Sequence, residues 1–330
     1  MLGLLSPLSF AGLTLRNRIA MPPMWSGQAK PDGQVTDQIV EYHRIRAAAG
    51  CGLITVEHSF VHPGGRHSAT QMGAHDDAMI PGLTRLASAI KAEGAVACLQ
   101  ITHAGSRTSS AVTGRRIVGP SAVRNPRERD GEVPDDLTPG GIAEVVAAFG
   151  DAAARARAAG FDAVEIHGAH GFLLSQFLSP LCNRRHDEYG GSPVGRRRIY
   201  LEVVAEVRRR IGTDHAISVR LGACDEATGG LTLDEGCATA AALAGAGVDL
   251  ISVSGGLQGS EPPGREPGYF VPYAAAIKSF VAVPVMVAGG IADPAFADQI
   301  VRSGQADLVG VGRAMLNDAD WARKAIARLT

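Results

Sequence analysis

Two histidines three residues apart could act together on one ligand atom. His167 and His170 stand in the run HGAHGF, where an apolar stretch ends. Two imidazole N–H groups aimed at one oxygen can stabilise negative charge that develops on it during a reaction. The pair could instead be structural, or could ligate a metal with His58 and His103, although carboxylate support for such a metal is missing. The spacing leaves these alternatives open, and we predict no metal site.

A second group of residues has the composition of a phosphate site. Gly289 and Gly290 follow one apolar run, and Gly312 and Arg313 follow the next. Backbone N–H groups in short glycine turns can face an anion, and an arginine adds a charge-assisted hydrogen bond. These glycines could also serve tight turns without any ligand. Because two successive runs carry the pattern and an arginine is attached, the sequence favours phosphate binding.

Arg220 is a candidate for a buried charge. It alternates with Ser218 along a further apolar run, so its side chain should point into the fold. A buried arginine needs an anionic partner because an unpaired buried charge is costly. Glu165, which precedes His167 by two residues on the same inward face, could be that partner. The functional alternative is a ligand that becomes anionic during turnover.

Other chemistries find little support in the chain. Its only lysines are Lys30, Lys91, Lys278 and Lys324, and none ends an apolar run, so a Schiff-base enzyme lacks its nucleophile. Carboxylates are too few at these positions for a two-metal or magnesium site. The net charge of -1 provides no field that attracts nucleic acid or anionic lipid. We therefore predict a small-molecule substrate, and neither a nucleic-acid nor a membrane partner.

The elements that must position these residues alternate along the 330-residue chain. Short runs rich in Val, Ile, Leu and Ala, as strands buried on both faces require, are separated by amphipathic stretches. We predict strands at 17–24, 52–60, 95–103, 161–167, 216–222, 248–255, 283–290 and 306–313. We predict helices near 37–49, 77–93, 139–159, 194–211, 234–246, 269–280, 293–303 and 319–329. Eight strand–helix units close a (β/α)8 barrel, so residues 1–330 are predicted to form one α/β TIM-barrel domain, although length alone suggests about two domains.

A doubly wound sheet is the alternative architecture, but no GxGxxG follows the first strand. Two connections, 104–137 and 256–268, are too long for ordinary loops and follow strands 3 and 6 on the face where barrels carry their active sites. We predict that 104–137 is a lid. The apolar first fourteen residues are too short to span a membrane and should cover one end of the fold. Five cysteines without a CxxC pair indicate reduced thiols in a cytoplasmic protein.

Over essentially its whole length the chain resembles the Old Yellow Enzyme family of FMN-dependent oxidoreductases. The resemblance runs through LSPLSFAGLTLRNRIAMPPM, GLITVEHSFVHPGGR and LQITHAG, and it ends at ADLVGVGRAML. Its most specific stretch is FDAVEIHGAHGFLLSQFLSPLCNRRHDEYGGS. A histidine pair in place of a His–Asn pair is typical of the bacterial branch. The resemblance implies an FMN-binding barrel that uses NADH or NADPH to reduce an activated alkene, such as an α,β-unsaturated carbonyl.

The resemblance also implies a role for each matching residue. The residues that would contact the flavin ring are Pro23, Met24, His58, Gln100 and Arg220, and those that would hold its phosphate are Gly289, Gly290, Gly312 and Arg313. Gln100 would hydrogen-bond the pyrimidine edge, and Arg220 would stabilise the anionic reduced flavin. His167 and His170 would bind the substrate carbonyl oxygen, which makes them, with Arg220, the implied catalytic residues. Hydride would pass from NAD(P)H to flavin N5 and then to the alkene β-carbon.

Three departures from the family pattern bear on the site. Phe172 stands where the family usually has a tyrosine that protonates the α-carbon, so water, His58 or Tyr269 would have to replace that donor. Trp25 stands where many bacterial members have Cys or Thr, and Gly27 where a substrate-facing Tyr is common. We predict that Trp25, Phe172 and Tyr269 form the substrate pocket, with a packed core tryptophan as the alternative for Trp25. The usual GGSxENR becomes GGSPVGR at 190–196, which removes a helix-capping glutamate.

These observations leave three hypotheses about function. The first is NAD(P)H-dependent reduction of an alkene. The second, motivated by Phe172, is FMN-dependent oxidation of an amine or N-methyl compound, or desaturation of a ring, because such hydride transfer needs no proton donor. The third is a barrel that carries flavin without turnover. No redox domain follows the barrel before Thr330, so we expect electrons to travel by a diffusing partner, and we leave open whether the protein is a homo-oligomer.

Overall fold

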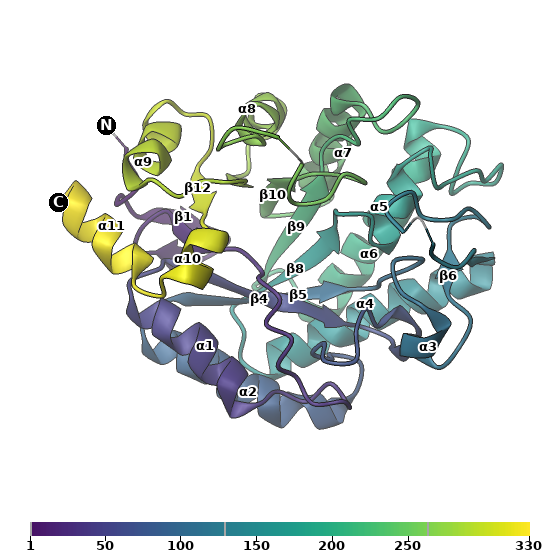
Figure 1. The fold of residues 1–330 in the computed structure, drawn as a ribbon, viewed down its shortest axis with the longest axis horizontal. Coiled ribbons are helices and arrows are strands. Elements are labelled where there is room, and N and C mark those ends of the chain that lie inside the picture. The colour runs from purple at the N-terminus through teal and green to yellow at the C-terminus, as the bar shows by residue number, and fades with distance from the viewer. Residues whose placement is uncertain (1, 129, 263) are drawn as a thin grey trace.

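The computed structural model, which describes residues 2–128, 130–262 and 264–330, is a closed barrel of eight parallel strands surrounded by helices (Figure 1). Around the barrel the strand order is β10-β11-β12-β3-β4-β5-β8-β9. The strands are β3 (Ile19–Met21), β4 (Leu53–Phe60), β5 (Val96–Thr102), β8 (Ala163–Gly168), β9 (Ala216–Gly222), β10 (Leu250–Ser254), β11 (Val285–Ala288) and β12 (Leu308–Gly310). The predicted (β/α)8 architecture is therefore confirmed, and each predicted strand overlaps one of these eight, with β8 ending one residue later than predicted.

Helices predicted between the strands are present. They are α1 (Asp37–Ala48), α2 (Ile80–Ala92), α4 (Pro139–Ala158), α6 (Pro193–Ile211), α7 (Leu233–Gly245), α8 (Val271–Lys278), α9 (Pro294–Arg302) and α11 (Trp321–Leu329). The single helix predicted from residue 77 is wrong in one respect. A 3-10 turn, η2 (Asp77–Met79), comes first, and α2 begins at Ile80 because Pro81 fits only the first turn of an α-helix.

Caps expected before the prolines of two helices are present. The Thr138 hydroxyl accepts a hydrogen bond from the Gly141 amide at the start of α4. The Ser192 hydroxyl accepts one from the Gly195 amide at the start of α6. Helix α6 is thus capped although the family's glutamate is missing, and the helix that packs behind the histidine strand still has a defined start.

The N-terminal segment closes the amino end of the barrel. Strands β1 (Leu8–Phe10) and β2 (Leu13–Leu15) form an antiparallel hairpin. Its side chains pack against the first inward residues of the barrel strands, among them Leu53, Ala216 and Leu250. The prediction that this segment covers one end of the fold is confirmed, and the opposite, carboxyl end of the barrel remains for a site.

Short elements occupy the long connections at the carboxyl end. The predicted lid, 104–137, contains α3 (Ser110–Thr113) and the paired strands β6 (Val118–Gly119) and β7 (Asp135–Asp136), which lie to the right in Figure 1. Two further short helices, α5 (Leu173–Leu178) and α10 (Arg313–Asn317), follow β8 and β12. These elements have too few residues to show a periodic pattern, so the sequence did not indicate them.

Two further findings concern the chain as a whole. In the part of the chain that the structure describes, no helix combines the length and apolar character needed to cross a membrane. All five cysteines are free thiols, as predicted.

Helix α6 supports the end of the strand that carries the histidines. The Tyr200 hydroxyl, fully buried on α6, donates a hydrogen bond of 2.8 Å to the carbonyl oxygen of Gly168. The ring lies so close that a Cβ at position 168 would be 2.3 Å from Tyr200 Cε1. Only glycine fits there, and the tyrosine fixes the backbone directly after His167.

We predict that Tyr200→Phe lowers the free energy of unfolding by about 1–2 kcal/mol, because it leaves the buried Gly168 carbonyl without its partner. Urea denaturation measures the loss. Tyr42→Phe is the matched control, since the buried Tyr42 hydroxyl has no hydrogen-bond partner among the described residues and its removal should be neutral or stabilising. Equal losses in the two variants would contradict the assigned role of the Tyr200 hydroxyl.

Candidate active site

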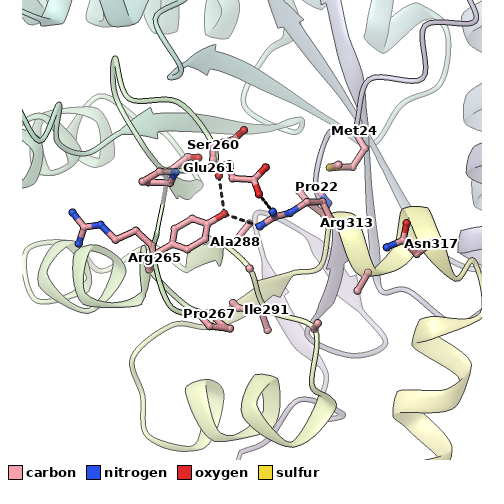
Figure 2. Close-up of a pocket in the computed structure, with 18 of the residues that line it drawn as sticks. Pro22, Met24, Ser260, Glu261, Arg265, Pro267, Ala288, Ile291, Arg313 and Asn317 are labelled. Atoms are coloured by element: carbon pink, nitrogen blue, oxygen red, sulfur yellow. Dashed lines mark hydrogen bonds and ion pairs between the residues drawn. The ribbon is translucent and has the colours of Figure 1, made fainter. Parts of the chain in front are cut away.

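A cavity of about 680 Å³ opens at the carboxyl end of the barrel (Figure 2). The segment after β3 contributes Pro22 and Met24, β9 contributes Arg220, and β10 contributes Ser254. The connection 256–268, the turn after β11 and the start of α10 complete its wall. The carboxyl ends of all strands meet at this face, so residues far apart in sequence line one cavity.

The residues predicted to bind phosphate lie together at one end of the cavity. Gly289, Gly290, Gly312 and Arg313 all line it. Gly290 has a φ of +67°, and a Cβ there would be 3.0 Å from the Tyr269 ring. At Gly312 a Cβ would be 2.9 Å from the Met24 sulfur. Glycine at these two positions lets the Tyr269 ring and the Met24 side chain lie close to the backbone. Without side chains of their own, the glycines leave their backbone facing the cavity.

Arg313 already has an anionic neighbour in the structure. Figure 2 shows its guanidinium facing Glu261, with which it forms an ion pair. The Arg313 Nη2 also donates to the Tyr269 hydroxyl at 3.1 Å, and that hydroxyl donates to the Ser260 carbonyl at 2.8 Å. Any other anion at Arg313 would thus compete with Glu261. Tyr269, predicted for the substrate pocket, lies at this end of the cavity.

Arg220 is a buried cation with an incomplete set of partners. Its Nη2 lies 3.4 Å from the Ser254 Oγ, and its Nε has no hydrogen-bond partner in the described chain. The expected ion pair with Glu165 is wrong, since no carboxylate of the described residues lies within 4.0 Å of this guanidinium. Burial lowers the pKa of Arg220, and an anion bound beside it would offset that cost.

Glu165 has other partners that satisfy its carboxylate. Gln100 Nε2 donates to it at 2.8 Å, and the Ser218 hydroxyl donates at 3.2 Å. Burial nevertheless raises the pKa of Glu165, while the more distant charge of Arg220 opposes that rise. Gln100 is therefore buried beside Glu165, and it does not itself line the cavity.

The histidine pair is packed beside Arg220 and Ser254. The rings of His167 and His170 lie 5.1 Å apart, and both residues are buried. Burial, with the neighbouring Arg220, holds the pKa of both imidazoles well below 6.5. At neutral pH both rings are thus uncharged, so they can act on a ligand by hydrogen bonding. The Nδ1 of His167 has no partner among the described residues.

His170 is held in an unusual backbone conformation. Its φ is +59°, which is uncommon for any residue but glycine. Its amide donates to the Gly255 carbonyl at 3.1 Å, and its own carbonyl accepts a hydrogen bond of 2.5 Å from Arg107. On the side-chain end, Nε2 lies 2.6 Å from the Ser254 Oγ. Gly255 and Arg107 therefore hold the backbone of His170, and Ser254 holds its ring.

Phe172 is the centre of an aromatic and cationic cluster. Its ring centroid lies 4.6 Å from His167, 5.4 Å from His58 and 5.3 Å from His67. The Arg107 guanidinium lies 4.9 Å from the same ring. Neither His67 nor Arg107 was predicted to belong to the site. The signal that could have found Arg107 is its place in the stretch HAGSR, directly after the end of β5.

Trp25 and His58 both lie near His67. Trp25 is 49% exposed, so the packed-core alternative is wrong, and its ring lies 6.5 Å from His67. His58 is 5.9 Å from His67, and its buried Nε2 has no partner in the described chain.

Pro23, between the cavity residues Pro22 and Met24, does not itself line the cavity. Arg220 and Ser254 connect the cavity with the histidine pair behind it. The described residues contain no cluster of three or more potential metal ligands.

A buried carboxyl group holds the segment that carries Met24 and Trp25. The Ser26 hydroxyl donates to Glu57 at 2.9 Å, and the Ser26 amide donates to the other carboxyl oxygen. Glu57 is fully buried, and burial raises its pKa from 4.5 to about 7. The two hydrogen bonds oppose this rise but do not cancel it.

The raised pKa of Glu57 predicts a pH-dependent stability. The folded state holds this proton more tightly than the unfolded state, so the free energy of unfolding should fall as pH rises from about 4.5 to about 7. The loss should be on the order of 3 kcal/mol. Glu57→Gln removes the titration, so the variant should gain on the wild type by this amount between pH 5 and pH 8 in urea denaturation. A difference between the two proteins that does not change with pH would contradict this assignment.

The comparisons with known proteins agree on one family. The sequence model of the NADH:flavin oxidoreductase / NADH oxidase family matches residues 3–330. An NADH oxidase of Thermoanaerobacter brockii is 42% identical over 95% of this chain, which spans about half (49%) of that relative's length. An NADPH dehydrogenase of Bacillus licheniformis is 40% identical over 99% of this chain and 94% of its own. The solved structure of the old yellow enzyme homologue from Zymomonas mobilis superposes with a TM-score of 0.86 at 26% identity, over 99% of this chain and 93% of the other.

Proposed function

The chain belongs to the NADH:flavin oxidoreductase / NADH oxidase family, and from this premise we propose that it is an FMN-dependent oxidoreductase that reduces activated alkenes with NADH or NADPH. The proposed substrate is an α,β-unsaturated carbonyl compound. The observation that carries the proposal is the buried Arg220, which lines the cavity beside His167 and whose Nε has no hydrogen-bond partner among the described residues. Such a cation suits a ligand that becomes negatively charged when it is reduced.

The residues of the cavity fit FMN. Gly289, Gly290, Gly312 and Arg313 would hold the phosphate, with Arg313 exchanging Glu261 for it. The backbone at Pro23 and the side chain of Met24 would contact the ring, with His58 and Gln100 near it. Arg220 would hold negative charge at its side. When bound, FMN would supply hydride transfer between the nicotinamide and the substrate.

The histidines would act on the substrate. Because His167 and His170 are neutral, their N–H groups would bind the carbonyl oxygen without bringing a charge of their own. These hydrogen bonds would draw electron density from the double bond and so prepare its β-carbon to accept hydride. This use of a histidine pair supports the bacterial branch of the family. Trp25 and Phe172 would limit the pocket.

Phe172 favours a second candidate, the FMN-dependent oxidation of an amine or N-methyl compound. Its ring cannot donate a proton. The ring packs against three histidines and Arg107. Oxidation by hydride loss from a C–H bond needs no donor at this place. The histidine pair, which has no evident task in amine oxidation, favours alkene reduction over this candidate.

The spectrum of the purified protein tests both candidates. We expect bound FMN, bleaching by NADH or NADPH without oxygen, and recovery of the oxidised spectrum when cyclohex-2-enone is added. Arg313→Ala should weaken FMN binding by at least about tenfold, because it removes a charge-assisted contact to the phosphate. A protein that takes up no FMN would refute both candidates. Bleaching by an N-methylated amine, with no reoxidation by any enone, would establish the second in place of the first.

A further inference from the structure

A serine connects the buried arginine with one histidine of the pair. Ser254, fully buried at the end of β10, places its Oγ 2.6 Å from His170 Nε2 and 3.4 Å from Arg220 Nη2. Arg220 and Ser254 line the cavity, while His170 lies behind it. Among the described side chains, the Ser254 hydroxyl is the hydrogen-bond partner that Arg220 and His170 share.

The hydrogen-bonding capacity of the three groups restricts the position of the protons. A guanidinium can only donate, so the Ser254 oxygen must accept from Arg220. A hydroxyl carries one proton, and no acceptor other than His170 Nε2 lies near this one in the described chain. The Ser254 oxygen accepts a hydrogen bond from Arg220. Its own proton then finds an acceptor if the hydroxyl donates to His170 Nε2. The neutral ring of His170 then carries its own proton on Nδ1.

The remaining ring nitrogen, Nδ1, faces no hydrogen-bond partner from the described residues. No hydrogen bond to His170 Nδ1 occurs within the described chain. This atom is also not one of the fully buried polar atoms without a partner, so it keeps some access to solvent or ligand. The contacts with Gly255 and Arg107 fix the backbone of His170, and the contact with Ser254 holds Nε2 toward the serine. An Nδ1–H group in this place can only donate, so a ligand atom that faces it must accept its hydrogen bond.

We propose that Ser254 is a positioning residue that fixes His170 as the Nδ1–H tautomer, and so restricts the ligand atom at this histidine to a hydrogen-bond acceptor, such as a carbonyl oxygen. The inference about the ligand rests on the proposed function; the tautomer itself does not. Without the hydroxyl, His170 is free to carry its proton on Nε2. Its Nδ1 would then present a lone pair to a carbonyl oxygen and repel it.

Nitrogen NMR of ¹⁵N-histidine-labelled protein, with FMN added, tests the tautomer directly. His170 is assigned as the signal pair that His170→Gln lacks. We expect Nδ1 protonated and Nε2 unprotonated in the wild type near pH 7. A His170 protonated at Nε2, or at both nitrogens, would overturn the proposal. His170→Asn, which suits the left-handed backbone at this position, gives the same assignment if His170→Gln does not fold.

Two substitutions test the role of the hydroxyl. Ser254→Ala should give a mixture of both tautomers and, measured at saturating FMN, raise the KM for cyclohex-2-enone about fivefold or more. Ser254→Thr, which keeps the hydroxyl, should restore the wild-type tautomer and KM. A wild-type tautomer in Ser254→Ala would show that another group sets it and would overturn the proposal. An Nδ1–H tautomer in a protein that turns over no enone would instead refute the proposed function and leave the role of Ser254 standing.

Discussion

The burial of one positive charge sets the conditions for the whole site. Arg220 lies near the carboxyl end of β9, shielded from water, and from the described residues it has one long side-chain hydrogen bond and no partner for Nε. Removing a guanidinium from water without a counter-ion costs free energy. The folded protein carries this desolvation penalty, and a bound anion can offset it. The same charge also helps to keep His167 and His170 neutral, because it opposes a second positive charge beside it. Charge and hydrogen-bond donors are thus placed side by side without competing.

The barrel explains why these groups meet. Arg220 on β9 lies beside His167 on β8 and Ser252 on β10 in the parallel register, so the strands bring their side chains to one level. Beyond the strand ends the chain relies on individual contacts. Arg107 and Gly255 hold the left-handed backbone of His170, and Tyr200 supports Gly168 from the helix behind. Rigid strands position the charge, and loops held by hydrogen bonds position the donors.

Much of this arrangement could be predicted from the sequence, and the part that could not has a physical reason. Eight buried apolar runs were enough for the barrel, and the alternation of Ser218 with Arg220 was enough to place the arginine inside. Alternation says which face a side chain takes but not which neighbour it bonds. Glu165 could therefore be named only as one possible partner of Arg220, whereas it accepts hydrogen bonds from Gln100 and Ser218. The contact of Ser254 with His170 joins residues 84 positions apart through a loop, and no local pattern encodes it. The cluster around Phe172 depends in the same way on loops whose course follows from tertiary packing.

The central claim is that Arg220 provides the charge for a ligand that becomes anionic when reduced. The reduction potential of bound FMN in the wild type and in Arg220→Gln tests this claim most directly. If Arg220 stabilises the reduced, negatively charged form, its replacement by a neutral side chain must make the potential more negative, and added salt should not restore it because the site is buried. A potential that is the same in both proteins, with FMN bound in each, would show that the charge of Arg220 serves another purpose and would contradict this account.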